Sequence, residues 1–214
     1  MKPNGKLILS ELRAHAPFTA LGTLAGIALL LALFWLKVPL DFSEHLFGIL
    51  HPSHVFLSAL ATTAMYRAYG RGGWVRTLLI GYIGSVGIGT LSDCLIPFVG
   101  EWMLDLPNRH LHLGFIEHWA IVNPLAIAGV LLGSWRPHIN LYHGLHVGVS
   151  TGASLFHMAM ALGIGSIPGP GMLVVIAGFL FLAVWVPCCT SDIVFPLWFA
   201  PPGAPLPKCS CHSH

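Results

Sequence analysis

The chain has 214 residues, of which 55% are hydrophobic and only 8% are charged, and its formal net charge is +2. So few charged side chains would leave a soluble domain of this size without a polar surface, and the near-neutral charge gives no reason to expect nucleic acid as a partner. The composition therefore predicts an all-α integral membrane protein surrounded by the lipid bilayer.

Six windows of the chain have the length and polarity of a transmembrane helix, which needs roughly 20 mainly apolar residues. The first includes the apolar run Leu29 to Leu36, and no small-residue cleavage site precedes Lys37, which favours a retained span over a signal peptide. The glycine-rich turn 67–73 separates the second window from the third, Arg136-Pro137 ends the fourth, and the turn 166–171 precedes the sixth. The expected spans are residues 17–36, 42–68, 74–99, 115–135, 141–164 and 172–199.

The distribution of basic residues predicts the orientation of the chain in the membrane. With six spans, only Lys37, in a short turn, and Arg109, in a polar loop, fall on one side of the membrane. Because positively charged loops stay in the cytoplasm, both termini are expected to be cytoplasmic, in a plasma or inner membrane. The residues expected on the cytoplasmic side are Lys2, Lys6, Arg13, Arg67, Arg71, Arg76, Arg136 and Lys208.

Two sequence patterns occur twice, in the same order, on corresponding spans. The pattern HxxHVxxSxxA begins at His51 in the second span and at His143 in the fifth. The pattern SDxxxP begins at Ser92 in the third span and at Ser191 in the sixth. Because these residue types are rare in lipid, we interpret their recurrence as an internal duplication.

A weaker similarity joins the first span to the fourth, between Leu24–Ile27 and Ile127–Val130. Each half then holds three spans, an odd number, so the halves would have opposite orientations in the membrane, as in many secondary transporters. The expected organisation is two inverted three-helix repeats, residues 1–100 and 101–199, followed by a flexible Cys/His tail, residues 200–214.

The repeated motifs carry the side chains expected to bind metal. Two histidines three residues apart lie on one face of a helix, and a carboxylate from a neighbouring helix can complete a shell of nitrogen and oxygen donors. Ionisable groups are costly in a bilayer, which favours a functional role for both aspartates. We predict one dinuclear or two symmetry-related sites for a divalent transition metal such as Zn²⁺, Mn²⁺, Fe²⁺ or Cu²⁺. The expected ligands are His51, His54, Asp93, His143, His146 and Asp192.

A structural role for these histidines is the alternative, because hydrogen bonds to serine or aspartate can simply hold helices together in a membrane. The serines available for such support are Ser58, Ser92, Ser150 and Ser191.

Further donors are candidates for accessory metal ligands. Thiols near the aspartates can bind metal, although buried cysteine also serves as a small apolar residue, and His157 is either a proton carrier or a packed imidazole. Short Cys/His tracts such as the one that ends the chain bind soft or borderline metals. The accessory candidates are Cys94, Cys188, Cys189, His157, Cys209, Cys211, His212 and His214. A third group near the expected outer face is either an entry funnel or a set of solvated loop residues, and comprises Glu44, His45, His110, His112, Glu117 and His118.

Three functions are compatible with these patterns. A transporter of a divalent metal ion is favoured by the inverted halves and the ligands near the midplane. A membrane metalloenzyme, either a hydrolase or an oxidoreductase, would use the same His/Asp centre to activate water or O₂. A haem-binding electron carrier would use histidines of the second and fifth spans as axial ligands. The sequence leaves open whether the chain also forms a homo-oligomer.

Overall fold

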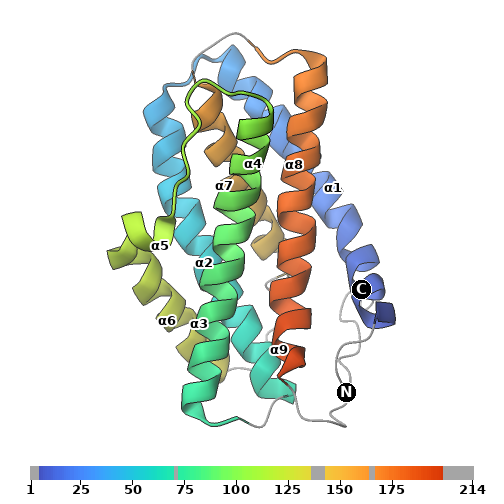
Figure 1. The fold of residues 1–214 in the computed structure, drawn as a ribbon, viewed down its shortest axis with the longest axis vertical. Helices are drawn as coiled ribbons and strands as arrows, with labels where there is room; N and C mark the ends of the chain where they lie inside the picture. Colours follow the sequence, from blue (N-terminus) through green and yellow to red (C-terminus); the bar gives the residue numbers. More distant parts are fainter. Residues whose placement is uncertain (1–4, 70–71, 136–142, 164–166, 200–214) are drawn as a thin grey trace.

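The computed structural model describes residues 5–69, 72–135, 143–163 and 167–199, and all regular structure in these ranges is helical (Figure 1). The first half contains α1 (Gly5–Trp35), α2 (Leu40–Tyr69) and a continuous run of α3 (Trp74–Thr90), the π-turn η1 (Leu91–Leu95) and α4 (Ile96–Met103). The second half contains α5 (Gly114–Glu117), α6 (Trp119–Trp135), α7 (His143–Leu162), α8 (Pro170–Cys189), the π-turn η2 (Thr190–Val194) and α9 (Phe195–Trp198).

Five of these helices are long and apolar enough to cross a membrane, and their outward faces are apolar as well. Leu21, Trp35, Val75 and Val174 are each more than two-thirds exposed, which is the surface expected of helices surrounded by lipid tails. The structure therefore supports the prediction of a helical integral membrane protein. The five candidate spans are Ile8–Trp35, Leu40–Tyr69, Trp74–Met103, Gly144–Leu162 and Pro170–Cys188.

The fourth expected span, residues 115–135, is not a single helix. The chain breaks between α5 and α6 at His118, where φ is −114° and ψ is 36°. The remaining helix α6 has 17 residues, or about 25 Å at 1.5 Å per residue, which is shorter than the hydrocarbon layer. In Figure 1 the segment after α4 runs back along the bundle before α5 begins, so α6 lies beside only part of it. Among the described residues, five of the six expected spans are therefore candidate spans of full length, and α6 is a shorter apolar helix.

Helix α6 packs closely on α2 through two glycines that are four residues apart. A Cβ atom at Gly129 would stand 2.5 Å from the carbonyl oxygen of Phe56, and one at Gly133 would stand 2.5 Å from that of Leu60. Small residues at this spacing let membrane helices approach each other closely.

Substitution of Gly129 by alanine is expected to lower the free energy of unfolding by about 1–3 kcal/mol, because the methyl group collides with the backbone of α2. The matched control is Gly87→Ala in α3, where an added Cβ meets no atom within 4 Å. Thermal unfolding of the purified protein in detergent measures both variants. Equal stability of the two would contradict this packing of α6.

The centre of the bundle is formed by α2 and α7, and α7 is the most buried of the candidate spans. One face of α7 packs Leu155 and Met158 against Leu30 of α1 and Leu180 of α8. The polar residues of α2 and α7 lie on the faces that meet η1 and η2, so the apolar core surrounds a buried polar interior.

Candidate metal centre

Both copies of the SDxxxP pattern begin on π-turns, the first on η1 and the second on η2, and their prolines lie in α4 and α9. In a π-turn, the carbonyl oxygen of one residue pairs with the N–H group five residues later. Five residues after Ser92 and Ser191 stand Pro97 and Pro196, which have no N–H group. The proline of each motif therefore leaves the carbonyl oxygen of its serine without a helical partner.

The two serine carbonyl oxygens accept hydrogen bonds from hydroxyl groups of α2 and α7. Ser154 Oγ donates to Ser92 O at 3.2 Å, and Thr62 Oγ1 donates to Ser191 O at 3.0 Å. Thr62 and Ser154 each stand eleven residues after the first histidine of their copy of HxxHVxxSxxA. Each π-turn is thus held by the motif helix of the other half of the chain.

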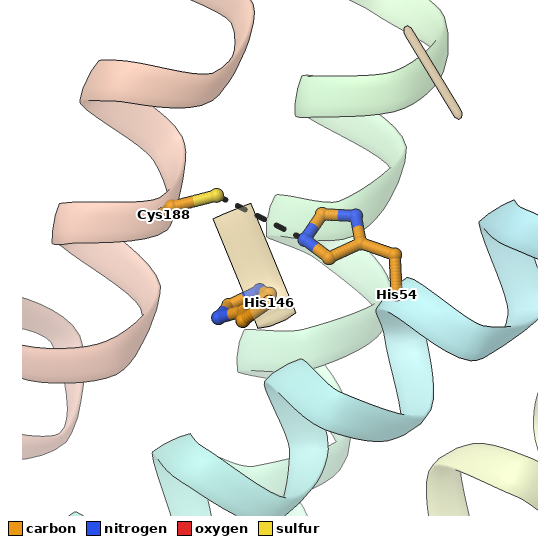
Figure 2. Close-up of side chains that lie close together, drawn as sticks. All are labelled: His54, His146 and Cys188. Carbon is orange, nitrogen blue, oxygen red and sulfur yellow. Dashed lines mark hydrogen bonds between the residues drawn. The ribbon is translucent and has the colours of Figure 1, made fainter. Parts of the chain in front are cut away.

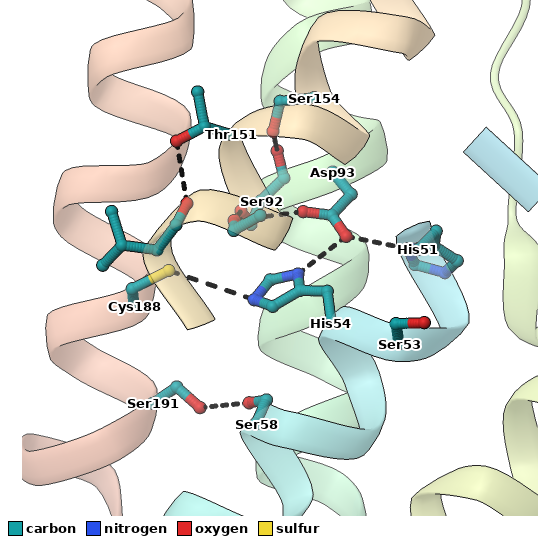
Figure 3. Close-up of polar contacts among 12 residues, drawn as sticks. His51, Ser53, His54, Ser58, Ser92, Asp93, Thr151, Ser154, Cys188 and Ser191 are labelled. Atoms are coloured by element: carbon teal, nitrogen blue, oxygen red, sulfur yellow. Dashed lines mark hydrogen bonds and ion pairs between the residues drawn. The ribbon is translucent and has the colours of Figure 1, made fainter. Parts of the chain in front are cut away.

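The hydroxyl groups of the same serines form a second pair of equivalent hydrogen bonds. Ser58 Oγ and Ser191 Oγ are 2.6 Å apart, and Ser92 Oγ and Ser150 Oγ are 2.9 Å apart. Figure 3 shows the Ser58–Ser191 contact beside the ring of His54. All four side chains are buried, so these contacts join α2 to η2 and α7 to η1 inside the bundle.

Asp93 holds both histidines of the first motif. Its Oδ2 accepts the Nδ1–H groups of His51 at 2.9 Å and His54 at 2.7 Å, and its Oδ1 accepts the hydroxyl of Ser150 at 3.3 Å (Figure 3). A neutral imidazole with its proton on Nδ1 has a free lone pair on Nε2. Asp93 therefore fixes both rings with Nε2 in the form that binds a metal.

A three-residue donor group lies next to this aspartate and consists of His54, His146 and Cys188, from α2, α7 and α8 (Figure 2). One ligand-capable atom of each residue lies within 4.8 Å of the other two, and all three side chains are buried. The rings of His54 and His146 have centroids 4.7 Å apart. We refer to these three residues as the buried centre.

The separation of the donor atoms suits a tetrahedral metal ion. His54 Nε2 lies 3.9 Å from Cys188 Sγ. With Zn–N of about 2.05 Å and Zn–S of about 2.3 Å, a tetrahedral zinc ion needs these two ligand atoms about 3.6 Å apart. A closure of a few tenths of an ångström would therefore bring both atoms into coordination. Two imidazoles and a thiolate leave a fourth position for water or another ligand.

The sequence predicts Asp93 as a metal ligand, whereas its carboxylate here stands behind His54, on the opposite side of the ring from Cys188. A carboxylate that accepts the second N–H group of a ligating histidine orients the ring and raises its basicity. In this arrangement Asp93 positions a ligand and does not need to touch the ion.

His51 points away from the buried centre, toward α5. Its ring stacks on Phe47 with centroids 5.4 Å apart, and a Cβ atom at Gly114 would stand 2.4 Å from its Nε2. Only glycine leaves room for the imidazole at this position. Among the described residues, His51 Nε2 has no hydrogen-bond partner, although it is buried.

A second buried pair of an acid and an imidazole also borders Phe47. His157 Nδ1 donates to Glu101 Oε1 at 2.5 Å, and both side chains are almost fully buried. The ring of Phe47 lies 5.3 Å from that of His157. The third span is expected to end at residue 99, but α4 continues to Met103 and encloses Glu101 in the bundle.

The third group of donors is accessible to solvent and lies on the loop between α4 and α5 and on α5 itself. His110, His112 and Glu117 each offer a ligand atom within 4.8 Å of the other two. Glu117 lies outside the candidate spans. Partial burial would raise the pKa of Glu117, but hydrogen bonds from His112 and from the N–H of Leu113 outweigh it and hold the pKa below its usual range.

The structure brings together some of the predicted ligands and leaves others apart. His51, His54, Asp93, His146 and Cys188 form one connected polar group. Cys94 packs in an apolar cluster and His157 bonds to Glu101. The backbone of three further candidates is helical while their side chains lie outside the described part: His143, Cys189 and Asp192. The tail donors lie wholly outside the described residues: Cys209, Cys211, His212 and His214.

Sequence reasoning missed Glu101, Phe47, Thr62 and Ser154. The last two had a signal, because extending the alignment of the duplicated motif by one residue beyond the pattern would have paired the hydroxyl of Thr62 with that of Ser154. Glu101 had none, because the contact with His157 depends on how α4 and α7 pack.

Comparison with known proteins gives no match to a family model, to a curated protein or to a solved structure.

Proposed function

We propose that this protein is a membrane transporter of a divalent transition-metal ion, which binds in transit to His54, His146 and Cys188. The observation that carries the proposal is a buried group of two imidazoles and a thiol between three helices. His54 stands 14 residues after the start of α2 and 15 before its end, about 21 Å from either end at 1.5 Å per residue. His146 and Cys188, by contrast, stand at the ends of the candidate spans Gly144–Leu162 and Pro170–Cys188. An ion at this site would be enclosed within the bundle, between three helices, as substrates of transporters are.

We further propose that the two halves of the chain are inverted repeats whose interface holds the site. Ser58 and Ser150 are equivalent positions of the two motif copies, and so are Ser191 and Ser92. The hydrogen bond between Ser58 and Ser191 is therefore equivalent to the one between Ser150 and Ser92. The hydrogen bond from Thr62 to the carbonyl oxygen of Ser191 is likewise equivalent to the one from Ser154 to the carbonyl oxygen of Ser92. These equivalent contacts support a pseudo-two-fold relation, and both sets cross between the halves.

Gly26 and Gly129, which match in the weaker similarity between the first and fourth expected spans, support the same relation. A Cβ atom at Gly26 would stand 3.6 Å from Thr151, and one at Gly129 would stand 2.8 Å from the Cβ of Ala59. Ala59 and Thr151 occupy the same position in the two copies of the motif. Helix α1 therefore packs on α7, the motif helix of the second half, and α6 packs on α2, the motif helix of the first half. Rocking of one half against the other would then expose the site to alternate sides of the membrane.

A metalloenzyme is the second candidate, because three protein ligands with an open fourth position are typical of catalytic zinc sites. A haem carrier is not favoured, since the rings of His54 and His146 are in contact, which leaves no space for a macrocycle between them.

Metal uptake into sealed vesicles separates transporter from enzyme. The full chain, reconstituted in vesicles that contain a zinc-sensitive dye, is expected to accumulate Zn²⁺, and His146→Ala should abolish the accumulation. The control is Asp41→Asn, which removes an exposed carboxylate of α2. Metal bound by the purified protein without any flux would contradict transport and favour the enzyme.

Cysteine labelling tests the predicted orientation. With the native cysteines replaced by alanine, Arg109→Cys is expected to react with an impermeant maleimide from outside intact cells, because the loop before α5 is the predicted outer side. Gly73→Cys, at the start of α3, should react only after the membrane is permeabilised. The reverse pattern would overturn the cytoplasmic assignment of the termini.

A further inference from the structure

We propose that His110, His112 and Glu117 form a second binding site for a divalent transition-metal ion, at the outer end of a route to the buried centre. The ligand-capable atoms of the three side chains lie within 4.8 Å of one another. Two imidazole nitrogens and a carboxylate oxygen are donors that zinc and neighbouring first-row metals accept. The role in capture rests on the proposed transport function, whereas metal binding at this site does not.

The carboxylate of this outer site is held in place before any ion arrives. Glu117 Oε2 accepts the Nδ1–H group of His112 at 3.1 Å, and Glu117 Oε1 accepts the backbone N–H of Leu113 at 3.2 Å. The ring of His110 lies beside that of His112, with centroids 4.6 Å apart. Little side-chain freedom is therefore left to lose on binding, which favours affinity.

The loop that carries the two histidines is fixed to the bundle. The backbone N–H of Asn108 donates to the carbonyl oxygen of Ala161 in α7 at 3.1 Å, and that of Leu106 donates to the carbonyl oxygen of Glu101 in α4 at 3.0 Å. The side chain of Leu106 is buried in the core around α7. The outer site thus rests on two helices of the bundle.

A chain of ring contacts leads from the outer site to the residues around Asp93. His112 meets His157 edge to face, with centroids 5.4 Å apart. Phe47 contacts His112 at 6.0 Å, His157 at 5.3 Å and His51 at 5.4 Å. One aromatic side chain therefore borders the outer site, the His157–Glu101 pair and the histidine that bonds to Asp93.

The outer site and the buried centre differ in solvent exposure, and we therefore expect them to differ in metal affinity. The side chains of His112 and Glu117 are 27% and 36% exposed, whereas His54 and His146 are almost fully buried. An ion at the outer site keeps contact with water and binds through oxygen and nitrogen only. We therefore expect it to bind more weakly and to exchange faster than an ion held by the thiolate of Cys188, as a capture site requires.

Cobalt binding to the full chain in detergent, measured by equilibrium dialysis, tests the outer site. His54→Ala with Cys188→Ser removes two donors of the buried centre, and Cys209→Ser, Cys211→Ser, His212→Ala and His214→Ala remove those of the tail. This background is expected to retain one Co²⁺ per chain. Adding His110→Ala or Glu117→Gln should lower the remaining affinity at least about tenfold.

Asp41→Asn in the same background, which removes an exposed carboxylate of α2 outside the donor groups, is the matched control and should leave the affinity unchanged. His110 is exposed, so its removal spares the packing of the bundle. The outer site is refuted if the background binds no Co²⁺, or if neither His110→Ala nor Glu117→Gln weakens binding. If Co²⁺ binding is weakened by both variants but the parent protein shows no metal flux into vesicles, the proposed transport function is contradicted and the outer site is still supported.

Discussion

Replacing Cys188 with serine is expected to lower the affinity of the protein for Zn²⁺ by more than about 100-fold, because loss of a partner behind a ligand already costs about 10–100-fold and here the ligand itself is lost. Cys188 Sγ is the thiol that faces His54 Nε2. Isothermal titration of the purified chain, with both tail cysteines replaced by serine, measures the change.

Cys94→Ser is the matched control for this variant. Cys94 is equally buried, but it packs with Phe47, Phe156 and Met160 in an apolar cluster. Its replacement is expected to lower stability by about 1–3 kcal/mol, through a buried hydroxyl, and to leave zinc affinity unchanged. Equal loss of affinity in both variants would mean that the thiol of Cys188 acts through packing and not as a ligand.

Replacing Asp93 with asparagine is expected to lower zinc affinity by about 10–100-fold and to abolish flux. Both N–H groups go to the same carboxylate oxygen, Oδ2, so an amide oxygen in that place can still accept them, but it is neutral and therefore a weaker acceptor than a carboxylate. The imidazole of His54 then loses the negative charge that raises the basicity of its metal-facing Nε2. The shape of the side chain is preserved, so the fold should remain.

Zinc titration and vesicle flux check this expectation, with Asp105→Asn as the control. Asp105 pairs with Arg109 on the surface and is 86% exposed. The proposed internal duplication predicts the same loss for Asp192→Asn. Near-normal binding and flux in Asp93→Asn would support a purely structural role for Asp93, because an amide can still bond to Ser150.

Several features of the site follow from local rules that a sequence displays. The spacing of His51 and His54 puts both on one side of α2, and an aspartate inside an apolar run must find a partner, so their meeting with Asp93 is predictable. The duplicated order of the motifs indicates which helices exchange contacts. Proline five residues after a serine marks the freed carbonyl oxygen, although the π-turn itself depends on packing.

Other features depend on the rotation and depth of helices, which hydropathy does not encode. Cys188 lies in an apolar run and looks like a packing residue until α8 turns it toward His54. Glu101 stands beyond the apolar part of its span, yet α4 carries it into contact with His157. The break at His118 is invisible to a hydropathy window because apolar residues flank it on both sides. The expected span 115–135 therefore merged two elements.

X-ray absorption at the zinc edge reports the atoms that touch the ion, and it therefore tests directly whether the ligands of the buried centre bind zinc. The full chain with Cys209→Ser and Cys211→Ser is loaded with one Zn²⁺ per molecule. We expect one sulfur neighbour at about 2.3 Å and imidazole nitrogens at about 2.0–2.1 Å, with the sulfur lost in Cys188→Ser. A shell of nitrogen and oxygen alone in the parent protein, or a sulfur signal that survives Cys188→Ser, would contradict a metal centre formed by His54, His146 and Cys188.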